Sequence, residues 1–352
     1  MGQTASGLKI VSVGGGTGLS TLLSGLKTYV SKEPVSTRAS WIETLTAVVT
    51  VTDDGGSSGR LRDEFQILPP GDIRNCIVAL AEDEHLLTRL FQYRFESEGE
   101  LSGHSFGNLF LAALAGITGD FLEAIKVSSE VLAIKGRIFP STVQDVALVA
   151  ELVDGRVIRG ETNIVESRSR IKRLRLSSEI CSPLPETLEA IKRADIITIG
   201  PGSLYTSIIP NLLVDGIVDS MRDSAALKVY ICNIMTQPGE TDNFDVEDHL
   251  RVLFEYSANL DLDYVLVNTS LISEELREKY LADGAAQVEF DSLARGRFEE
   301  LVQATLDTPE RTRSFQLLCR DVLHEDGLVR HDPDKLARLL LEIHQAEMLA
   351  AR

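Results

Sequence analysis

Short apolar runs alternate along the chain with stretches whose apolar residues recur every three to four positions. The first run, 8–13, is followed by leucines at 19, 22, 23 and 26, a spacing that places them on one face of a helix. Further runs with the length of buried strands lie at 41–51, 195–199, 228–234 and 264–268. Buried strands alternating with helices predict a Rossmann-like three-layer α/β/α fold with a mostly parallel sheet.

Residues 137–180 interrupt this pattern. Two strand-like stretches, 146–153 and 156–162, flank Asp154-Gly155, and because this dipeptide favours a type I′ turn we expect a hairpin. The basic run 168–175, RSRIKRLR, alternates with apolar residues, which indicates an edge strand rather than a nucleic-acid-binding arm. We therefore expect one domain over residues 1–352, with 137–180 as a small antiparallel insertion and with an amphipathic helix over 333–351.

Glycine-rich loops follow two of the predicted strands. The loop GGGTG at 14–18 joins a strand to a helix, as in loops whose N–H groups face a phosphate. It lacks the glycine of the dinucleotide fingerprint and the lysine of Walker A, because both would occupy the position of Leu19; this argues against an NAD(P)-dependent oxidoreductase. The loop GPGSLYTS at 200–207 offers three hydroxyls near a helix start and is our predicted diphosphate site. The alternative for the loop at 14–18 is a tight turn that only packs a helix against the sheet.

The stretch 51–62, VTDDGGSSGRLR, combines two carboxylates with glycines, serines and arginines. Asp53 and Asp54 could hold ribose or sugar hydroxyls, or bind Mg²⁺. Arg60 offers a forked cation that suits phosphate. The alternative for this stretch is a solvated surface loop closed by a salt bridge.

Two more motifs place polar residues at predicted helix starts. In PPGDIRN (69–75), Asp72 is the expected N-cap of a helix that runs on to Phe91. Arg74 lies in its first turn, where a cation is unfavourable, so it needs an anionic ligand or a nearby carboxylate. In SGHSFGN (102–108), His104 and Asn108 are expected to enter the interior at the start of a buried apolar helix. Here Ser105 could be a cap, and His104 is either a ligand group or a structural one.

Charge and cysteine content restrict the partners. The formal net charge is −18 and the pI about 4.8, so nucleic acid and anionic membranes are repelled at long range. An anionic ligand then has to be held by local N–H groups and arginines. The four cysteines are far apart and form no CxxC pair, which argues against a zinc site or a disulfide framework and for a reducing cytoplasm. We expect a cytoplasmic homo-oligomer that binds neither nucleic acid nor membrane.

Five segments, in this order, resemble a known family: VGGGTG, TDDGGSSGRLR, PPGDIRNC, GHSFGNLFLAAL and GPGSLYTSIIPNLLV. They are similar to the gluconeogenesis-factor proteins of bacteria, which belong to the wider family of 2-phospho-L-lactate transferase. For the first branch the resemblance implies a UDP-sugar ligand such as UDP-N-acetylglucosamine, and a regulatory role linking carbon flow to cell-wall precursors and cell shape. For the transferases it implies transfer of a phospholactyl group from a nucleoside diphosphate to a deazaflavin with Mg²⁺. The long TDDGGSSGRLR form is similar to the first branch.

We therefore predict a nucleotide-sugar-binding regulator that requires no cofactor and acts through a regulatory protein partner. The alternative is a transferase that uses Mg²⁺ at the Asp53/Asp54 pair. No catalytic residue and no metal ligand is assigned. The predicted ligand-binding residues are Gly14, Gly15, Gly16, Thr17, Gly18, Asp53, Asp54, Gly55, Gly56, Ser57, Ser58, Arg60, Asp72, Arg74, Asn75, His104, Ser105, Asn108, Gly200, Gly202, Ser203, Tyr205, Thr206 and Ser207.

Overall fold

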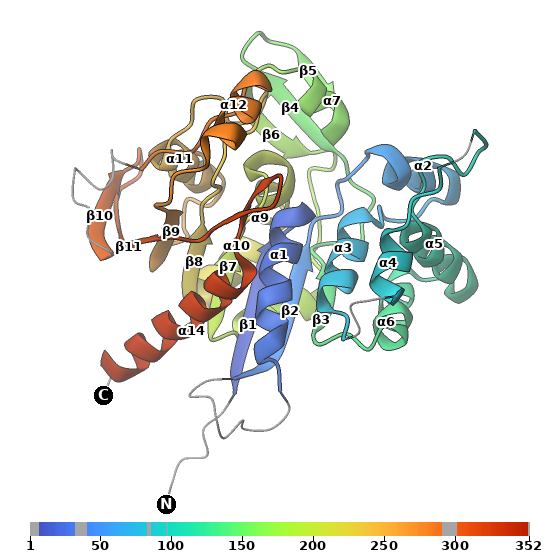
Figure 1. Ribbon diagram of the computed structural model, residues 1–352, viewed down its shortest axis with the longest axis horizontal. Coiled ribbons are helices and arrows are strands. Elements are labelled where there is room, and N and C mark those ends of the chain that lie inside the picture. The colour runs from blue at the N-terminus through green and yellow to red at the C-terminus, as the bar shows by residue number, and fades with distance from the viewer. Residues whose placement is uncertain (1–6, 32–40, 83–85, 97, 291–300, 351–352) are drawn as a thin grey trace, which may run out of the picture.

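An eight-stranded sheet, in the order β10-β11-β9-β8-β7-β1-β2-β3, forms the centre of the computed structural model (Figure 1). The structure describes residues 7–31, 41–82, 86–96, 98–290 and 301–350. Within the sheet every neighbouring pair is parallel except β10 and β11, which confirms the predicted fold class. The strands are β1 (Leu8–Gly14), β2 (Ile42–Val49), β3 (Arg137–Pro140), β7 (Ile196–Ile199), β8 (Leu227–Ile231), β9 (Tyr264–Asn268), β10 (Leu301–Asp307) and β11 (Thr312–Arg320).

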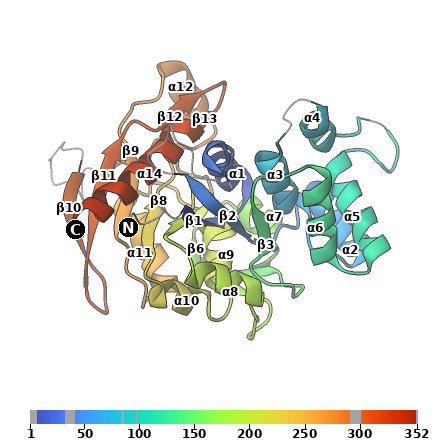
Figure 2. The ribbon, with the colours of Figure 1, turned by 90° about the horizontal axis from the view of Figure 1, so that it is seen from below.

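Helices cover both faces of this sheet. Figure 2 shows α1, α3 and α14 on one side and α8 and α10 on the other. Leu19, Leu22, Leu23 and Leu26 of α1 are all 0% exposed, as their spacing predicts, and each contributes about 1.5–3 kcal/mol through burial. The helices are α1 (Gly16–Leu26), α2 (Gly56–Phe65), α3 (Gly71–Leu80), α4 (Leu86–Gln92), α5 (Phe106–Thr118), α6 (Phe121–Val131), α7 (Glu161–Glu166), α8 (Pro185–Lys192), α9 (Ile209–Leu212), α10 (Ile217–Asp223), α11 (Val246–Tyr256), α12 (Glu274–Ala282) and α14 (Pro333–Ala350).

The order of the strands reverses at β1. This strand pairs with β2 on one side and with β7 on the other, so the loops that follow β1 and β7 start side by side at one edge of the sheet. In open parallel sheets, the crevice at such a switch point is where ligands bind. The fold therefore brings the loops 14–18 and 200–207 together.

The insertion is smaller than predicted. A second sheet in the order β5-β4-β6 contains the expected hairpin, β4 (Leu148–Leu152) and β5 (Val157–Arg159), and the expected edge strand β6 (Ile171–Leu176). Residues 137–140, however, form β3 of the main sheet, parallel to β2. Glu161 and Thr162 lie in α7 rather than in the hairpin, because Gly160 at φ +95° ends the strand just before them.

Two helix predictions were wrong. The expected helix from 72 to 91 is divided into α3 and α4, because Ala81 takes an extended conformation with ψ 140° after α3. The N-cap of α3 is Pro70, and Asp72 lies inside the first turn. Helix α5, expected to be buried, buries one face only, since Ile117 is 80% exposed.

Other features of the chain match the sequence more closely. The side chain of Ser105 accepts the N–H of Asn108 and thus caps α5. The C-terminal helix α14 packs against α1. All four cysteines are buried free thiols. Within the described residues, no helix combines the length and apolar composition needed to cross a bilayer.

Candidate functional site

A pocket of about 340 Å³ opens at the switch point, above the ends of β1 and β7. Its volume falls in the range of roughly 300–1,000 Å³ that small-molecule pockets occupy. The start of α1 forms one wall, where the first N–H groups of a helix have no partner within the helix and can face an anion. The predicted residues that line the pocket are Gly15, Gly16, Thr17, Gly18, Gly202, Ser203 and Ser207.

The two loops touch so closely that side chains are excluded between them. A Cβ atom on Gly18 would lie 2.6 Å from the carbonyl oxygen of Pro201, closer than packed atoms approach. Behind the loops, the buried side chain of Asn211 donates from Nδ2 to the carbonyl oxygens of Gly14 at 3.0 Å and Ser207 at 2.8 Å. One amide thus fixes both loops, although Gly14 itself does not line the pocket.

The loop after β8 supplies a second polar wall. The Oδ1 atom of Asn233 accepts the N–H of Gly202 at 3.3 Å, and Nε2 of Gln237 donates to the hydroxyl of Ser203 at 2.7 Å. Sequence reasoning did not assign these two amides to the site. The signal was nevertheless present, because this loop also follows the carboxyl end of a parallel strand.

A hairpin from the C-terminal part of the chain covers the pocket. Strands β12 (Leu323–Glu325) and β13 (Val329–His331) form it, and residues Leu328–His331 line the pocket together with Tyr280 of α12. The N–H of Val329 donates to the hydroxyl of Tyr280 at 3.0 Å. Burial lowers the pKa of His331 to about 4, so its ring is neutral and Nε2 donates to the carbonyl of Cys232 at 3.1 Å. The ligand-binding residues predicted from the sequence end at Ser207, so sequence reasoning missed this part of the pocket.

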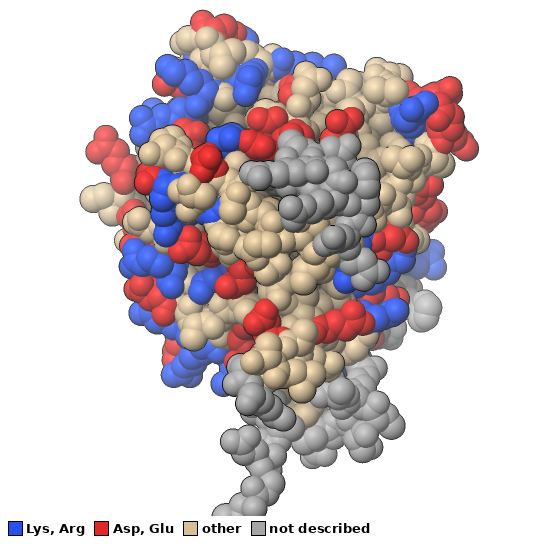
Figure 3. Space-filling view, turned by 90° about the vertical axis from the view of Figure 1, so that its left-hand side faces the viewer, with Lys and Arg blue, Asp and Glu red and all other residues tan. Residues whose placement is uncertain are grey.

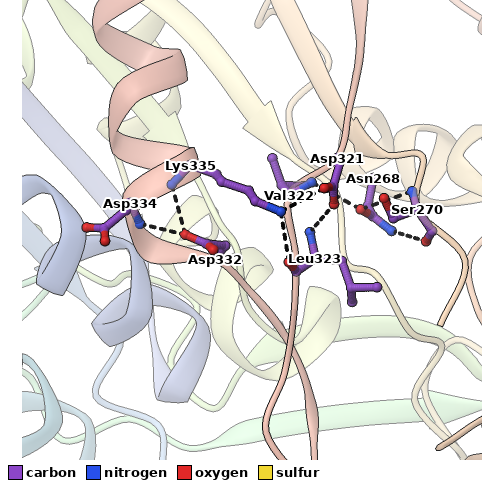
Figure 4. Close-up of polar contacts among 8 residues, drawn as sticks. All are labelled: Asn268, Ser270, Asp321, Val322, Leu323, Asp332, Asp334 and Lys335. Carbon is purple, nitrogen blue, oxygen red and sulfur yellow. Dashed lines mark hydrogen bonds and ion pairs between the residues drawn. The ribbon is translucent and has the colours of Figure 1, made fainter. Parts of the chain in front are cut away.

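Polar contacts anchor the base of the hairpin (Figure 4). At the end of β9, Oδ1 of Asn268 accepts the N–H of Val322 at 3.2 Å. From α14, Nζ of Lys335 donates to Oδ2 of Asp321 at 2.7 Å, and Oδ1 of Asp332 accepts the N–H of Lys335 at 2.9 Å. The hairpin is therefore tied to the end of β9 and to the start of α14, which holds it at the pocket.

An acidic compartment adjoins the pocket. The half-buried side chain of Asp72 accepts the N–H of Gly16. Loss of hydration, followed by the negative charge of Asp53, raises the pKa of Asp72 to about 6. The guanidinium of Arg74, which is also near both carboxylates, donates to the Ser105 hydroxyl at 2.7 Å and to Oδ1 of Asn75 at 2.6 Å. The alternatives expected from the sequence were an anionic ligand or a nearby carboxylate; the hydrogen-bond partners that the structure shows are instead a hydroxyl and an amide oxygen, and Asp72 and Asp53 act on this cation through their charge.

Asp53 and Asp54, the adjacent carboxylates of the stretch 51–62, have partners in different parts of the chain. Oδ1 of Asp53 accepts the N–H of Gly55 at 2.9 Å. Oδ1 of Asp54 accepts both the N–H and the hydroxyl of Thr162, each at 2.9 Å, and so ties the motif to α7. Such divergence follows from an extended backbone, in which successive side chains alternate in direction.

A buried polar chain connects α2 to α5. Nδ2 of Asn108 donates to the hydroxyl of Ser57 at 3.1 Å, and that hydroxyl lies 2.9 Å from Nδ1 of His104. Burial lowers the pKa of His104, which favours a neutral ring that accepts the hydroxyl proton.

Arg60 is exposed and donates to the carbonyl of Ser102 at 2.6 Å. The remaining predicted residues that do not line the pocket are Gly14, Asp53, Asp54, Gly55, Gly56, Ser57, Ser58, Arg60, Asp72, Arg74, Asn75, His104, Ser105, Asn108, Gly200, Tyr205 and Thr206.

Glu240 explains why two residues of the 200–207 loop turn away from the pocket. Its carboxyl group is 3% exposed and accepts the N–H of Tyr205 and the hydroxyl of Thr206, while its Oε2 atom has no partner. Burial raises the pKa of Glu240 to about 7. Glu161 lies nearby, and burial raises its pKa well above the usual range.

Charge is divided between the two compartments. Among the described residues that line the pocket, none has a carboxylate, and Arg330 contributes a guanidinium. The acidic side chains of Asp53, Asp72, Glu161 and Glu240 lie outside that lining. In a chain with a net charge of −18, a pocket of this composition is suited to an anion, with Tyr280 available for an aromatic group.

Comparisons with known proteins agree with the resemblance in the motifs. Residues 10–308 match the family model described as 2-phospho-L-lactate transferase CofD. The Bacillus subtilis gluconeogenesis factor is 46% identical over 337 residues, which cover 95% of this chain and 98% of that protein. A Thermotoga maritima protein of the gluconeogenesis-factor group is 49% identical over 336 residues, covering 96% and 99%. A crystal structure of a Bacillus halodurans protein has a TM-score of 0.83 and 42% identity, and covers 96% of this chain and all of that one.

Proposed function

The chain belongs to the 2-phospho-L-lactate transferase CofD family, and we propose that it is a regulator that binds a UDP-sugar, with UDP-N-acetylglucosamine as the representative ligand. Its role would be that of the gluconeogenesis factors, linking carbon flow to cell-wall precursor synthesis and cell shape. The observation that carries this proposal is the pocket at the switch point, which has no carboxylate among its described lining residues.

Each part of such a ligand has a chemical counterpart in the pocket. The diphosphate suits the N–H groups at the start of α1, the hydroxyls of Ser203 and Ser207, and the guanidinium of Arg330. The uracil ring suits the aromatic face of Tyr280. The sugar hydroxyls and the amide of an N-acetyl group suit the side-chain amides of Asn233 and Gln237.

The Mg²⁺ of the transferase branch has a poor match here. The carboxylates of Asp53 and Asp54 diverge, and each accepts N–H groups of its own. Within the described part of the chain, no group of three or more His, Cys, Asp or Glu side chains is arranged to hold a metal ion. The proposal therefore contains no metal-dependent step, and we expect UDP-N-acetylglucosamine to bind equally well in EDTA and in millimolar Mg²⁺.

Isothermal titration calorimetry tests the ligand and the pocket together. UDP-N-acetylglucosamine should bind in this titration. In a separate thermal unfolding experiment it should raise the melting temperature of the protein, because it binds only the folded state. Arg330→Gln should weaken binding by roughly tenfold to a hundredfold. This range corresponds to the loss of one hydrogen bond from a charged group, which contributes about 1.5–3 kcal/mol. Ser203→Tyr should abolish binding by filling the space next to Gln237.

Arg338→Gln is the matched control, because Arg338 is an exposed arginine on α14 outside the pocket lining. Equal affinity in the Arg330 and Arg338 variants would contradict the proposed site. Binding of NAD(P) without binding of any UDP-sugar would contradict the proposed ligand. Release of a nucleoside monophosphate, dependent on Mg²⁺, would favour the transferase instead.

A further inference from the structure

The insertion sheet β5-β4-β6 has a charge opposite to that of the whole protein. Over residues 147–177 basic side chains outnumber acidic ones, although the net charge of the chain is −18. One face of this sheet is apolar and buried in the core through Leu148, Ala150 and Leu174. The other face is turned outward, and it carries the exposed side chains of Arg159, Arg173 and Arg175.

The strand register defines this outer face. Val149 of β4 is paired with Arg159 of β5 and with Arg175 of β6. The next outward position, Glu151, is paired with Val157 and Arg173. Because cross-strand partners share a face, the outer face consists of two rows, Arg159–Val149–Arg175 and Val157–Glu151–Arg173.

The arginines of this outer face form no ion pair with a described residue, although the charge of Arg173 acts on its cross-strand neighbour Glu151. Within the described residues, no carboxylate lies within ion-pair distance of Arg159, Arg173 or Arg175, whereas Glu151 is engaged by Lys172. Several arginines on other surfaces are paired, for example Arg222 with Asp219, and Figure 3 shows basic and acidic side chains interspersed on the face that carries β10. Val157 is 65% exposed. The outer face thus offers guanidinium groups that form no ion pair within the described residues, and they lie around an exposed apolar residue.

We propose that the outer face of β5-β4-β6 is the docking surface for an acidic segment of a partner protein. Guanidinium groups that are not engaged in ion pairs favour carboxylates, which they can bind through two parallel hydrogen bonds. Nucleic acid and anionic membranes fit less well, because a net charge of −18 repels large polyanions at long range. Moreover, Glu151 stands in the middle of the outer face, and Val157 suits an apolar side chain of a peptide rather than a phosphate.

This inference rests on the proposed regulatory function, because a regulator needs a surface that is connected to its ligand site. The insertion is in direct contact with the acidic compartment, through the bonds from Thr162 to Asp54. A Cβ atom on Gly160, at the end of β5, would overlap Oδ2 of Asp54, and one on Gly239 would lie 3.0 Å from Cα of Arg168. Figure 1 shows β4, β5, β6 and α7 grouped next to the start of α1.

Fluorescence anisotropy with a defined probe tests the docking surface. The probe is a fluorescein-labelled peptide of alternating glutamate and valine, about 15 residues long, which can lie extended on a sheet. The full-length protein should bind it saturably, and R173E/R175E should weaken binding roughly tenfold. The matched control R193E/R222E makes the same change in net charge at exposed arginines of α8 and α10 and should alter affinity less than twofold.

Several results would overturn the proposal. These are the absence of saturable peptide binding, equal effects of the two double variants, and tighter binding of a single-stranded oligonucleotide or of phosphatidylglycerol vesicles than of the peptide. Calorimetry with UDP-N-acetylglucosamine on the same proteins separates this proposal from the ligand proposal. Both double variants should retain sugar-nucleotide binding, and its absence in every protein would instead contradict the proposed function.

Discussion

Replacing Glu240 with glutamine should stabilise the protein at alkaline pH and have a smaller effect at acidic pH. Glu240 is 3% exposed, its carboxyl group accepts from Tyr205 and Thr206, and its Oε2 atom has no partner. Burial raises the pKa of this carboxyl from 4.5 to about 7. Glutamine has the same shape and keeps an acceptor oxygen, but it cannot ionise.

The sign of the effect follows from proton linkage. A carboxyl whose pKa is higher in the folded protein favours folding while it is protonated, and this contribution is lost as the pH rises through the folded pKa. One pKa unit corresponds to about 1.4 kcal/mol. The shift from 4.5 to about 7 therefore costs the wild type roughly 3 kcal/mol at high pH, about 2 kcal/mol of it between pH 5.5 and pH 8.5.

Urea unfolding at pH 5.5, 7 and 8.5, followed by the fluorescence of the single, buried Trp41, measures this difference. The difference in the free energy of unfolding between Glu240→Gln and wild type should increase by about 2 kcal/mol, in favour of the variant, from pH 5.5 to pH 8.5. Asp72 is present in both proteins, so its own titration cancels. Glu275→Gln, an exposed substitution on α12, should show no such trend. A constant difference between Glu240→Gln and wild type at all three pH values would refute the reasoning.

Two further substitutions test the contact between the loops. Gly18→Ala should weaken the binding of UDP-N-acetylglucosamine, measured by calorimetry, because the added Cβ atom would lie 2.6 Å from the Pro201 carbonyl oxygen. Gly116→Ala is the control, because a Cβ atom at Gly116 would have no atom within 4 Å. Asn211→Ala should lower the free energy of unfolding by roughly 1–3 kcal/mol, because the carbonyls of Gly14 and Ser207 each lose one hydrogen bond. Wild-type stability of the Asn211 variant in urea would show that these two hydrogen bonds contribute little.

Local patterns were sufficient to predict the layers of the fold and the loops that meet at the switch point. The leucines of α1 are buried because their spacing is that of one helix face, and Ser105 caps α5 because a short hydroxyl reaches an N–H three residues on. The helix over 72–91 failed for a related reason. The helical spacing of apolar residues continues past Leu80, so the spacing gives no indication that the helix ends before Ala81.

The second half of the pocket could not be predicted, because it depends on contacts between distant parts of the chain. Tyr280 and Arg330 are more than 250 positions from the start of α1 in the sequence, and the fold places them at the same pocket. Neither lies in a glycine-rich loop, and a charged residue in a short strand has no distinctive spacing. Asp72 was misassigned for a similar reason, since its partner is the N–H of Gly16, more than fifty positions earlier in the sequence.

The separation of acidic and anion-binding groups explains how a chain of this net charge can offer an anion site. Asp72 lies at the boundary, with its carboxylate on the N–H of Gly16, at the start of the same helix that lines the pocket. There it interacts favourably with the positive end of the helix dipole. Burial, together with Asp53, raises its pKa to about 6, so that part of its charge is removed by protonation in mildly acidic solution. In mildly acidic solution the acidic compartment would therefore repel the proposed diphosphate less than its composition suggests, and the guanidinium of Arg330 in the pocket lining would attract this ligand.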